Sequence, residues 1–220
     1  MNNIDARLVY ENSRKALNKA FPGLKGNDIA EICKLTQSTY RLEQPLVAGN
    51  TLYQFPVLAN QEIFANTEKR LLQQDSAVIY QIGIFAGAPV SAVDAAFIPD
   101  TYNSPLKYGV NAPPLLSLWN GSNFSIAVNN DILVPNWDVM KHYNAPETQQ
   151  TAALGAGSPQ DQFRGGFDGF EAMEPNVVLI GSKNNVIQLN LSVGIATVQA
   201  FSRAIVILRC ITAQNSSVVS

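Results

Sequence analysis

Charged side chains are scarce in this sequence. They make up 15% of its 220 residues, whereas about 25% is usual in a soluble domain. Asn and Gln take their place, with 21 Asn and 14 Gln against 17 acidic and 15 basic residues. The formal net charge of −2 lacks the basic excess of a nucleic-acid-binding domain, so we expect no sequence-specific nucleic-acid binding. A polar, uncharged surface fits a subunit covered by its neighbours, and it also fits a secreted binding domain.

Cysteine and histidine are rarer still. Cys33 and Cys210 lie far apart without a C-x-x-C spacing, which excludes a disulfide-stapled scaffold and a zinc ribbon. We predict two buried thiols, with a single distant disulfide as the alternative. His142 is the only histidine, so a His-rich metal centre lacks ligands. We therefore expect no metal and no cofactor, and we interpret His142 as a structural or surface residue.

Long apolar runs are also missing. No run approaches the roughly 20 residues of a membrane span, so we expect no transmembrane segment. The first 15 residues are polar and lack the apolar region of a secretory signal, which predicts synthesis in the cytoplasm.

Catalytic motifs are absent as well. Nothing resembles the nucleophile elbow G-x-S-x-G. The glycines at 155–158 and 165–166 do not open a helix after a strand, and 161–171 lacks the alternating acids of a calcium loop. Two carboxylates could catalyse glycoside hydrolysis, but no pair stands out among Glu43, Glu62, Glu68, Asp75, Asp94, Asp138, Asp168, Glu171 and Glu174. We expect no enzyme, no catalytic residues and no cofactor-binding residues, with an unrecognised hydrolase as a third hypothesis.

Helical periodicity is confined to the start of the chain. Residues 4–21 place apolar side chains at helical spacing, and Pro22 and Gly23 end that helix. A second short helix is predicted from Asn27, as its N-cap, to Leu35. Residues 1–35 therefore form a helical arm, which packs either on its own domain or on a neighbouring subunit.

From Thr36 onward the period changes from 3.6 to two. The first two predicted strands form a hairpin, with Pro56 placing the second at a sheet edge. The apolar run 203–212 predicts a central strand covered on both faces. The predicted strands are 37–47, 51–58, 76–86, 115–119, 124–128, 132–134, 177–180, 186–193 and 203–212, with 137–142 as an additional candidate.

This pattern predicts a mainly β protein, an antiparallel β-sandwich with a jelly-roll-like arrangement over residues 36–220. Asn120-Gly121 and the turn at 129–131 have the chemistry of hairpin turns, because Asn and Gly tolerate positive φ. The segment 87–115 is long for a loop, so we expect it either to be functional or to be held by contacts in an assembly. The segment 144–170 is interpreted as an exposed or mobile loop rather than a second domain. In a coat protein, both loops would make contacts between subunits.

Two further groups of residues bear on function. The run Thr67-Glu68-Lys69-Arg70 is interpreted as a solvated or subunit-contacting charge cluster. Aromatic side chains at the end of the sandwich could stack a sugar ring, although aromatics at strand spacing more often fill the core. The aromatic candidates are Tyr102, Tyr108, Trp119, Phe124 and Trp137.

Three segments carry a resemblance to a known group. TQSTYRLEQPLVAGNTLYQFPVLANQ (36–61), TEKRLLQQDSAVIYQIGIFAG (67–87) and RAIVILRCITAQNSS (203–217) resemble structural proteins of phages that infect Bacteroidetes-type bacteria. The shared texture is an amide-rich hairpin, a charged link and an apolar strand. The resemblance implies a coat or capsid-associated virion protein, whose partners are copies of itself and other virion proteins, and it implies no catalytic residue.

The leading hypothesis is accordingly a non-enzymatic virion structural protein that assembles through subunit contacts and is located in the virion. The alternative is a receptor- or carbohydrate-binding β-sandwich of a fibre or secreted protein.

Overall fold

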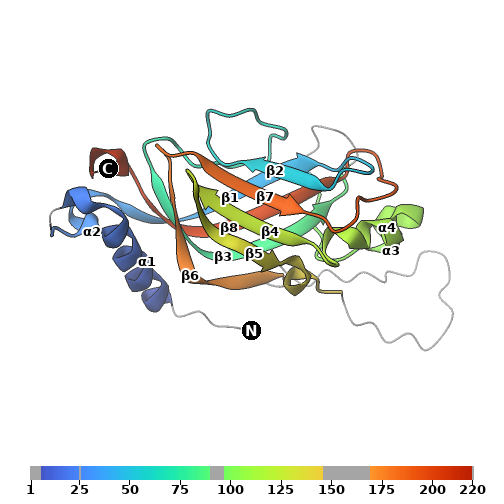
Figure 1. The fold of residues 1–220 in the computed structure, drawn as a ribbon, viewed down its shortest axis with the longest axis horizontal. Helices are drawn as coiled ribbons and strands as arrows, with labels where there is room; N and C mark the ends of the chain where they lie inside the picture. Colours follow the sequence, from blue (N-terminus) through green and yellow to red (C-terminus); the bar gives the residue numbers. More distant parts are fainter. Residues whose placement is uncertain (1–5, 25, 90–96, 146–168, 220) are drawn as a thin grey trace.

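Two four-stranded antiparallel sheets form the body of the protein (Figure 1). The computed structural model describes residues 6–24, 26–89, 97–145 and 169–219. Sheet A has the strand order β1 (Leu35–Pro45), β8 (Arg203–Ala213), β3 (Ser76–Gly87), β6 (Phe170–Ile180). Sheet B has the order β2 (Leu52–Pro56), β7 (Asn185–Asn190), β4 (Asn123–Val128), β5 (Asp131–Asp138).

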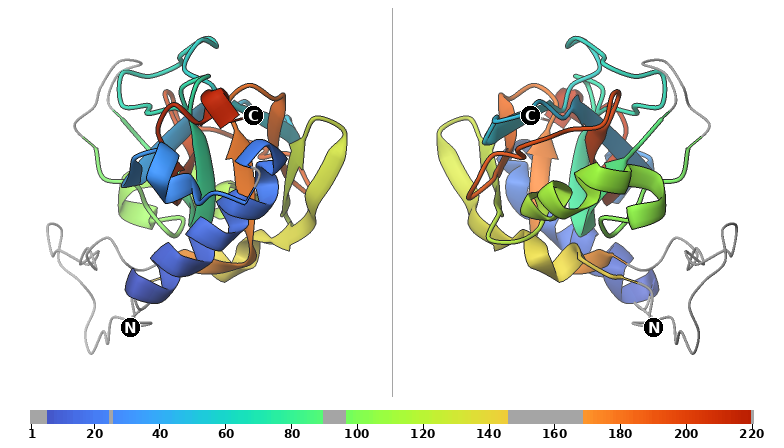
Figure 2. Two further views of the ribbon diagram at one scale, coloured as in Figure 1. Left: turned by 90° about the vertical axis from the view of Figure 1, so that its left-hand side faces the viewer. Right: turned by 90° about the vertical axis from the view of Figure 1, so that its right-hand side faces the viewer.

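The chain changes sheet at almost every step. Only β4 and β5 are both consecutive in sequence and neighbours in one sheet. Long-range pairing closes sheet A, where Leu35 lies opposite Ala213 and Pro45 lies opposite Arg203. Eight antiparallel strands wound into two sheets in this way form a jelly roll. The predicted β-sandwich is therefore confirmed, with sheet twist and layering visible end-on in Figure 2.

The main core lies between the two sheets. In β4, Phe124, Ile126 and Val128 point into it, and the residues between them face outward. In β8 nearly every residue is buried, because helix and loop segments also cover the outer face of sheet A. The prediction that 203–212 forms a central strand is confirmed, since β8 lies between β1 and β3.

The N-terminal helix packs on its own domain. Helix α1 (Ala6–Ala20) lies against β3 and β6 on the outer face of sheet A. Its residue Leu17 and the following Phe21 form a second apolar cluster with Val78 of β3 and Ile180 of β6. The helix predicted over 4–21 is confirmed over its described part, and the burial of its apolar face favours packing within the chain over docking on a neighbour.

The second helix is shorter than predicted. Helix α2 (Ile29–Ile32) follows the 3-10 turn η1 (Pro22–Leu24). Its N-cap is Asp28, not Asn27, and the Asp28 carboxylate accepts a hydrogen bond from the amide of Ala30. The carboxylate also interacts favourably with the helix N-terminus, which explains the difference.

The predicted hairpin of the first two strands is wrong. β1 pairs with β8 in sheet A, and β2 pairs with β7 in sheet B. Local turn chemistry at 48–50 suggested a hairpin, but each strand completes its ladder with a strand from the last third of the chain. Pro56 does lie in an edge strand, as predicted, because β2 has a single partner.

Two predicted strands are helical. Residues 115–118 fall in α4 (Ala112–Leu115) and the 3-10 helix η3 (Leu116–Leu118), and Trp119 follows in a turn. Two prolines in the first turn of α4 start this helix, since proline fits there without losing a hydrogen bond. The additional candidate 137–142 ends β5 and then forms η4 (Val139–His142), whose N-cap is Asp138.

The two long loops are only partly described. In 87–115, residues 90–96 lie outside the described part, and the rest includes α3 (Pro105–Tyr108), η2 (Gly109–Asn111) and α4. In 144–170, residues 146–168 lie outside it, and β6 begins at Phe170, before the predicted Val177. After β8, η5 (Ser216–Val219) is the last described helix.

Proline marks the edges of both sheets. Each outer strand contains one, whereas β3, β8, β4 and β7 contain none. A proline cannot donate to a ladder, so it weakens pairing with a further strand. The four edge prolines are Pro45 in β1, Pro56 in β2, Pro135 in β5 and Pro175 in β6.

Candidate functional site

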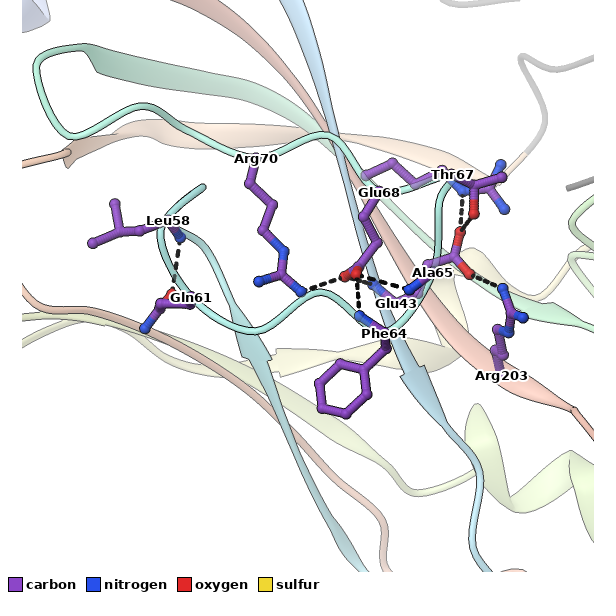
Figure 3. A network of polar contacts seen from close by, with 10 residues as sticks. Glu43, Leu58, Gln61, Phe64, Ala65, Thr67, Glu68, Arg70 and Arg203 are labelled. Atoms are coloured by element: carbon purple, nitrogen blue, oxygen red, sulfur yellow. Dashed lines mark hydrogen bonds and ion pairs between the residues drawn. The ribbon is translucent and has the colours of Figure 1, made fainter. Parts of the chain in front are cut away.

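A buried network of charges lies beside the edge formed by β1 and β2 (Figure 3). The Glu43 carboxylate of β1 has no exposed surface and accepts a hydrogen bond at 2.6 Å from Arg41 Nε and one at 2.8 Å from Arg203 Nη1. The hydroxyl of Thr67 also donates to Glu43. A carboxylate so deeply buried requires partners of this kind, because an unpaired buried charge is strongly unfavourable.

A second buried carboxylate organises the β2–β3 loop, residues 57–75. Glu68 Oε2 accepts hydrogen bonds from the amides of Phe64 and Ala65, at 2.7 and 3.2 Å. Glu68 Oε1 accepts from the amide of Glu43 at 3.0 Å and from Arg70 Nη2 at 2.8 Å. Glu68 Oε2 therefore bonds only to the loop backbone, whereas Glu68 Oε1 links the loop to β1 and to Arg70.

The network overturns the interpretation of Thr67-Glu68-Lys69-Arg70 as a solvated or subunit-contacting cluster. The side chains of Glu68 and Arg70 are 0% and 2% exposed. Lys69, which lies between them, is exposed. The backbone of Lys69 bonds that of Arg41 in both directions, at 2.8 and 2.9 Å. The loop therefore behaves as an additional layer fixed on β1.

Glu43 and Glu68 are the two candidate acids that the fold brings together. Both carboxylates are buried and fully engaged by donors, so neither offers a free oxygen to a substrate. Asp75 is buried and accepts from the amide of Asn215. Of the others, Glu62, Asp138 and Glu174 are exposed, Glu171 is half-buried, and Asp94 and Asp168 lie outside the described residues. The glycine runs at 155–158 and 165–166 also lie outside them.

The segment before α3 is hydrogen bonded to the segment after His142, through Thr101 and Asn144. The Thr101 hydroxyl donates to the carbonyl of Asn144, and the Asn144 amide donates to the carbonyl of Thr101. His142 itself is wholly buried between Trp137 and Gly169. Burial lowers its pKa to about 4. It is a structural residue, in agreement with its interpretation from the sequence.

Most of the aromatic candidates are core residues. Trp119 and Phe124 have no exposed surface, and Tyr108 is almost fully buried. The indole of Trp119 donates to the carbonyl of Ile84. Tyr102 is half-buried. The half-buried Trp137 carries the Lys141 ammonium 4.7 Å from its ring centroid, so that ring face is already occupied.

The outer face of sheet B carries no charge on β2, β7 and β4. The central row runs through Gln54, Gln188 and Ser125, which lie side by side in the ladder. The flanking rows are Leu52–Asn190–Asn123 and Pro56–Val186–Ala127. Among the described elements, no helix lies over this face in Figure 1. A face with no charge on three adjacent strands is unusual for a surface that stays in water.

The cysteines remain thiols. Cys33 and Cys210 are both free and buried, as predicted, and burial raises the pKa of each. Across residues 6–24, 26–89, 97–145 and 169–219, no group of three His, Cys, Asp or Glu side chains is placed to hold a metal ion. The helices in these ranges include none with the length and apolar character of a membrane span.

Sequence reasoning missed the role of Arg203 and Arg41. A signal was present, since Arg203 opens a strand that is largely apolar and a buried cation needs a partner. Their guanidinium carbons lie 5.7 and 5.2 Å from the ring centroid of Phe97, which covers this end of sheet A. The partner carboxylate, Glu43, could not be predicted from the sequence, because only the pairing of β1 with β8 brings it next to Arg203.

The chain matches no protein-family model, no curated protein and no solved structure. A functional argument therefore depends on the residues and the fold of this chain alone.

Proposed function

We propose that this protein is a non-enzymatic virion structural protein, a coat or capsid-associated subunit. Its partners are copies of itself and other virion proteins, and its location is the virion. The observation that carries the proposal is the strand order β1-β8-β3-β6 facing β2-β7-β4-β5. The double-sheet jelly roll recurs in viral capsid domains.

Fold alone does not define function, and two surface features add support. The outer face of sheet B is free of charge on three of its strands. The edge strands carry prolines that hinder uncontrolled strand pairing. Such a surface suits a subunit that is covered by neighbours through side-chain contacts.

The test is the state of the purified protein. Light scattering after size exclusion, followed by negative-stain microscopy, should reveal rings, shells or other regular assemblies. Protein that stays monomeric at high concentration would overturn the proposal.

The second candidate is a receptor- or carbohydrate-binding module, which the same fold favours because lectin domains also adopt it. It requires an accessible aromatic platform, for which the half-buried candidates are Tyr102 and Trp137, the latter with Lys141 over one ring face. Trimers that bind a glycan array, with binding lost in Trp137→Ala, would favour this function over the first.

A further inference from the structure

The sequence contains a single Asn-Gly step, at Asn120-Gly121. The structure places it in an exposed turn that leads from η3 into β4, and not in a hairpin between two strands. Gly121 has a positive φ of 70°, which glycine adopts readily because it has no Cβ. For the same reason, no side chain of Gly121 shields its own amide nitrogen from the carboxamide of Asn120.

The turn leaves both of these groups without a hydrogen bond. Neither the Asn120 carboxamide nor the Gly121 amide has a hydrogen-bond partner in the part of the chain that the structure describes. The backbone around them is held in place, because the amide of Asn120 donates to the carbonyl of Leu116 at 2.9 Å and the Ser192 hydroxyl donates to the carbonyl of Asn120 at 3.3 Å. The two groups that can react with each other are therefore free to do so.

The Asn-Ser step at Asn103-Ser104 is a contrasting case. Asn103 Nδ2 donates to the carbonyl of Ala112 at 2.7 Å, and Asn103 Oδ1 accepts from the Tyr143 hydroxyl at 2.9 Å. The amide of Ser104 donates to the carbonyl of Tyr102 at 3.1 Å. Carboxamide and amide are thus both engaged, so the fold protects this step.

The two other Asn-Ser steps are protected in different ways. Asn12-Ser13 lies within α1, where backbone amides bond to carbonyls one turn earlier. Ser216, which follows Asn215, is only 1% exposed. Asn120 is therefore the asparagine at which local sequence and fold both permit reaction with the next residue.

We propose that Asn120 is a site of spontaneous deamidation in the folded protein. The Gly121 amide nitrogen attacks Cγ of Asn120 and gives up its proton, the bond from Cγ to the carboxamide nitrogen breaks, and ammonia leaves. The product is a five-membered succinimide. Water then opens the ring at Cγ, which gives aspartate, or at the main-chain carbonyl carbon, which gives isoaspartate. This modification does not depend on the proposed function.

Both products change the turn. Each adds a negative charge to a chain whose formal net charge is −2, and isoaspartate also lengthens the main chain by one carbon atom. The flanking residues leave little room for this extra atom, because Trp119 is fully buried and the Ser122 hydroxyl donates to the carbonyl of Ser117 at 2.6 Å. Isoaspartate at position 120 should therefore destabilise the fold more than aspartate does.

The test is to age the folded protein in warm, mildly alkaline buffer. Peptide mapping by mass spectrometry should show residue 120 converted to aspartate and isoaspartate, while Asn103 stays intact. Isoaspartate should also accept methyl groups from an isoaspartyl methyltransferase. In Asn120→Gln, where the ring would need six members, methyl acceptance should stay at the level of freshly purified protein. Unchanged circular dichroism and melting temperature show that this variant is folded.

A denatured sample supplies the second control. Asn103 should react after unfolding, which shows that the fold protects it. Native protein in which Asn103 reacts as fast as Asn120, or in which Asn120→Gln accepts as many methyl groups as the unmodified protein, would overturn the proposal. Anion exchange separates the aged products, and the isoaspartate form should unfold at a lower urea concentration than Asn120→Asp. Equal midpoints would overturn the predicted strain on the turn.

Discussion

The indole Nε1 of Trp137 donates a hydrogen bond to Nε2 of His142 across 2.9 Å. An indole N–H can only donate, so Nε2 of the imidazole must be unprotonated. The proton then resides on Nδ1, which donates to the carbonyl of Gly169 at 2.8 Å. The structure therefore holds a neutral imidazole in one tautomer, between η4 and the start of β6.

This arrangement predicts a loss of stability in acid. Burial lowers the pKa of His142 to about 4 in the folded protein, from 6.5 in the unfolded chain. Between these values the unfolded chain binds more protons, so the free energy of unfolding falls as the pH falls. The expected loss is about 3 kcal/mol from about pH 6.5 to about pH 4, measured by urea titration at successive pH values.

The chain provides its own control, because it has a single histidine. In His142→Gln the pH slope between 5 and 6.5 should largely disappear, while the carboxylates still titrate at lower pH. An identical slope in both proteins would contradict the assignment.

Glu43 should be far more important for stability than an acid on the surface. Glu43→Gln removes the carboxylate charge that the buried Arg203 and Arg41 guanidinium groups contact, and we expect a loss of about 3 kcal/mol in the free energy of unfolding. The matched control is Glu11→Gln, which removes a half-exposed pair with Arg14 and should cost less than about 0.5 kcal/mol. Equal effects in chemical denaturation would show that the buried network adds no stability.

Both thiols should be unreactive in the folded protein. Burial raises the pKa of Cys33 and of Cys210, so little thiolate is available to react. We expect slow labelling by a thiol reagent under native conditions and labelling of two thiols after denaturation without a reductant. Absence of labelling in the denatured sample would indicate a disulfide.

A positive charge on the outer face of sheet B should impair assembly. Gln188→Lys places a charge at the centre of this face, where a covering neighbour would have to desolvate it. Thr39→Lys, at an exposed position on the outer side of sheet A, is the control. Particle yield by light scattering should fall in the first variant and be maintained in the second, and equal yields would indicate that the face stays open in the particle.

Local sequence was sufficient to predict many strands but not their partners. The apolar runs of β3 and β8 and the Asn129 turn were predicted, because periodicity and positive-φ chemistry are local properties. Asn129 indeed has φ 55° in the β4–β5 turn. The partners of β1 were not predictable, since its ladder with β8 joins residues about as far apart as the chain allows.

The charge network was invisible for the same reason. Glu68 and Arg70 look like surface residues in a run of polar side chains, and only the folding of the β2–β3 loop over β1 buries them. Likewise, residues 115–119 were predicted as a strand, although the spacing of Leu115 and Leu118 puts both on one face of a helical turn and on opposite faces of a strand. Tertiary packing, with prolines in the first turn, decided the outcome.

The edge prolines have a consequence for how the protein can accumulate. A β-sandwich that reaches high concentration in a cell risks open-ended pairing of edge strands from copy to copy, which ends in fibres. With Pro45, Pro56, Pro135 and Pro175 at the margins of the two sheets, backbone-driven growth is disfavoured from every side. Many copies can therefore accumulate without forming fibres, and regular assembly depends on contacts between specific side chains.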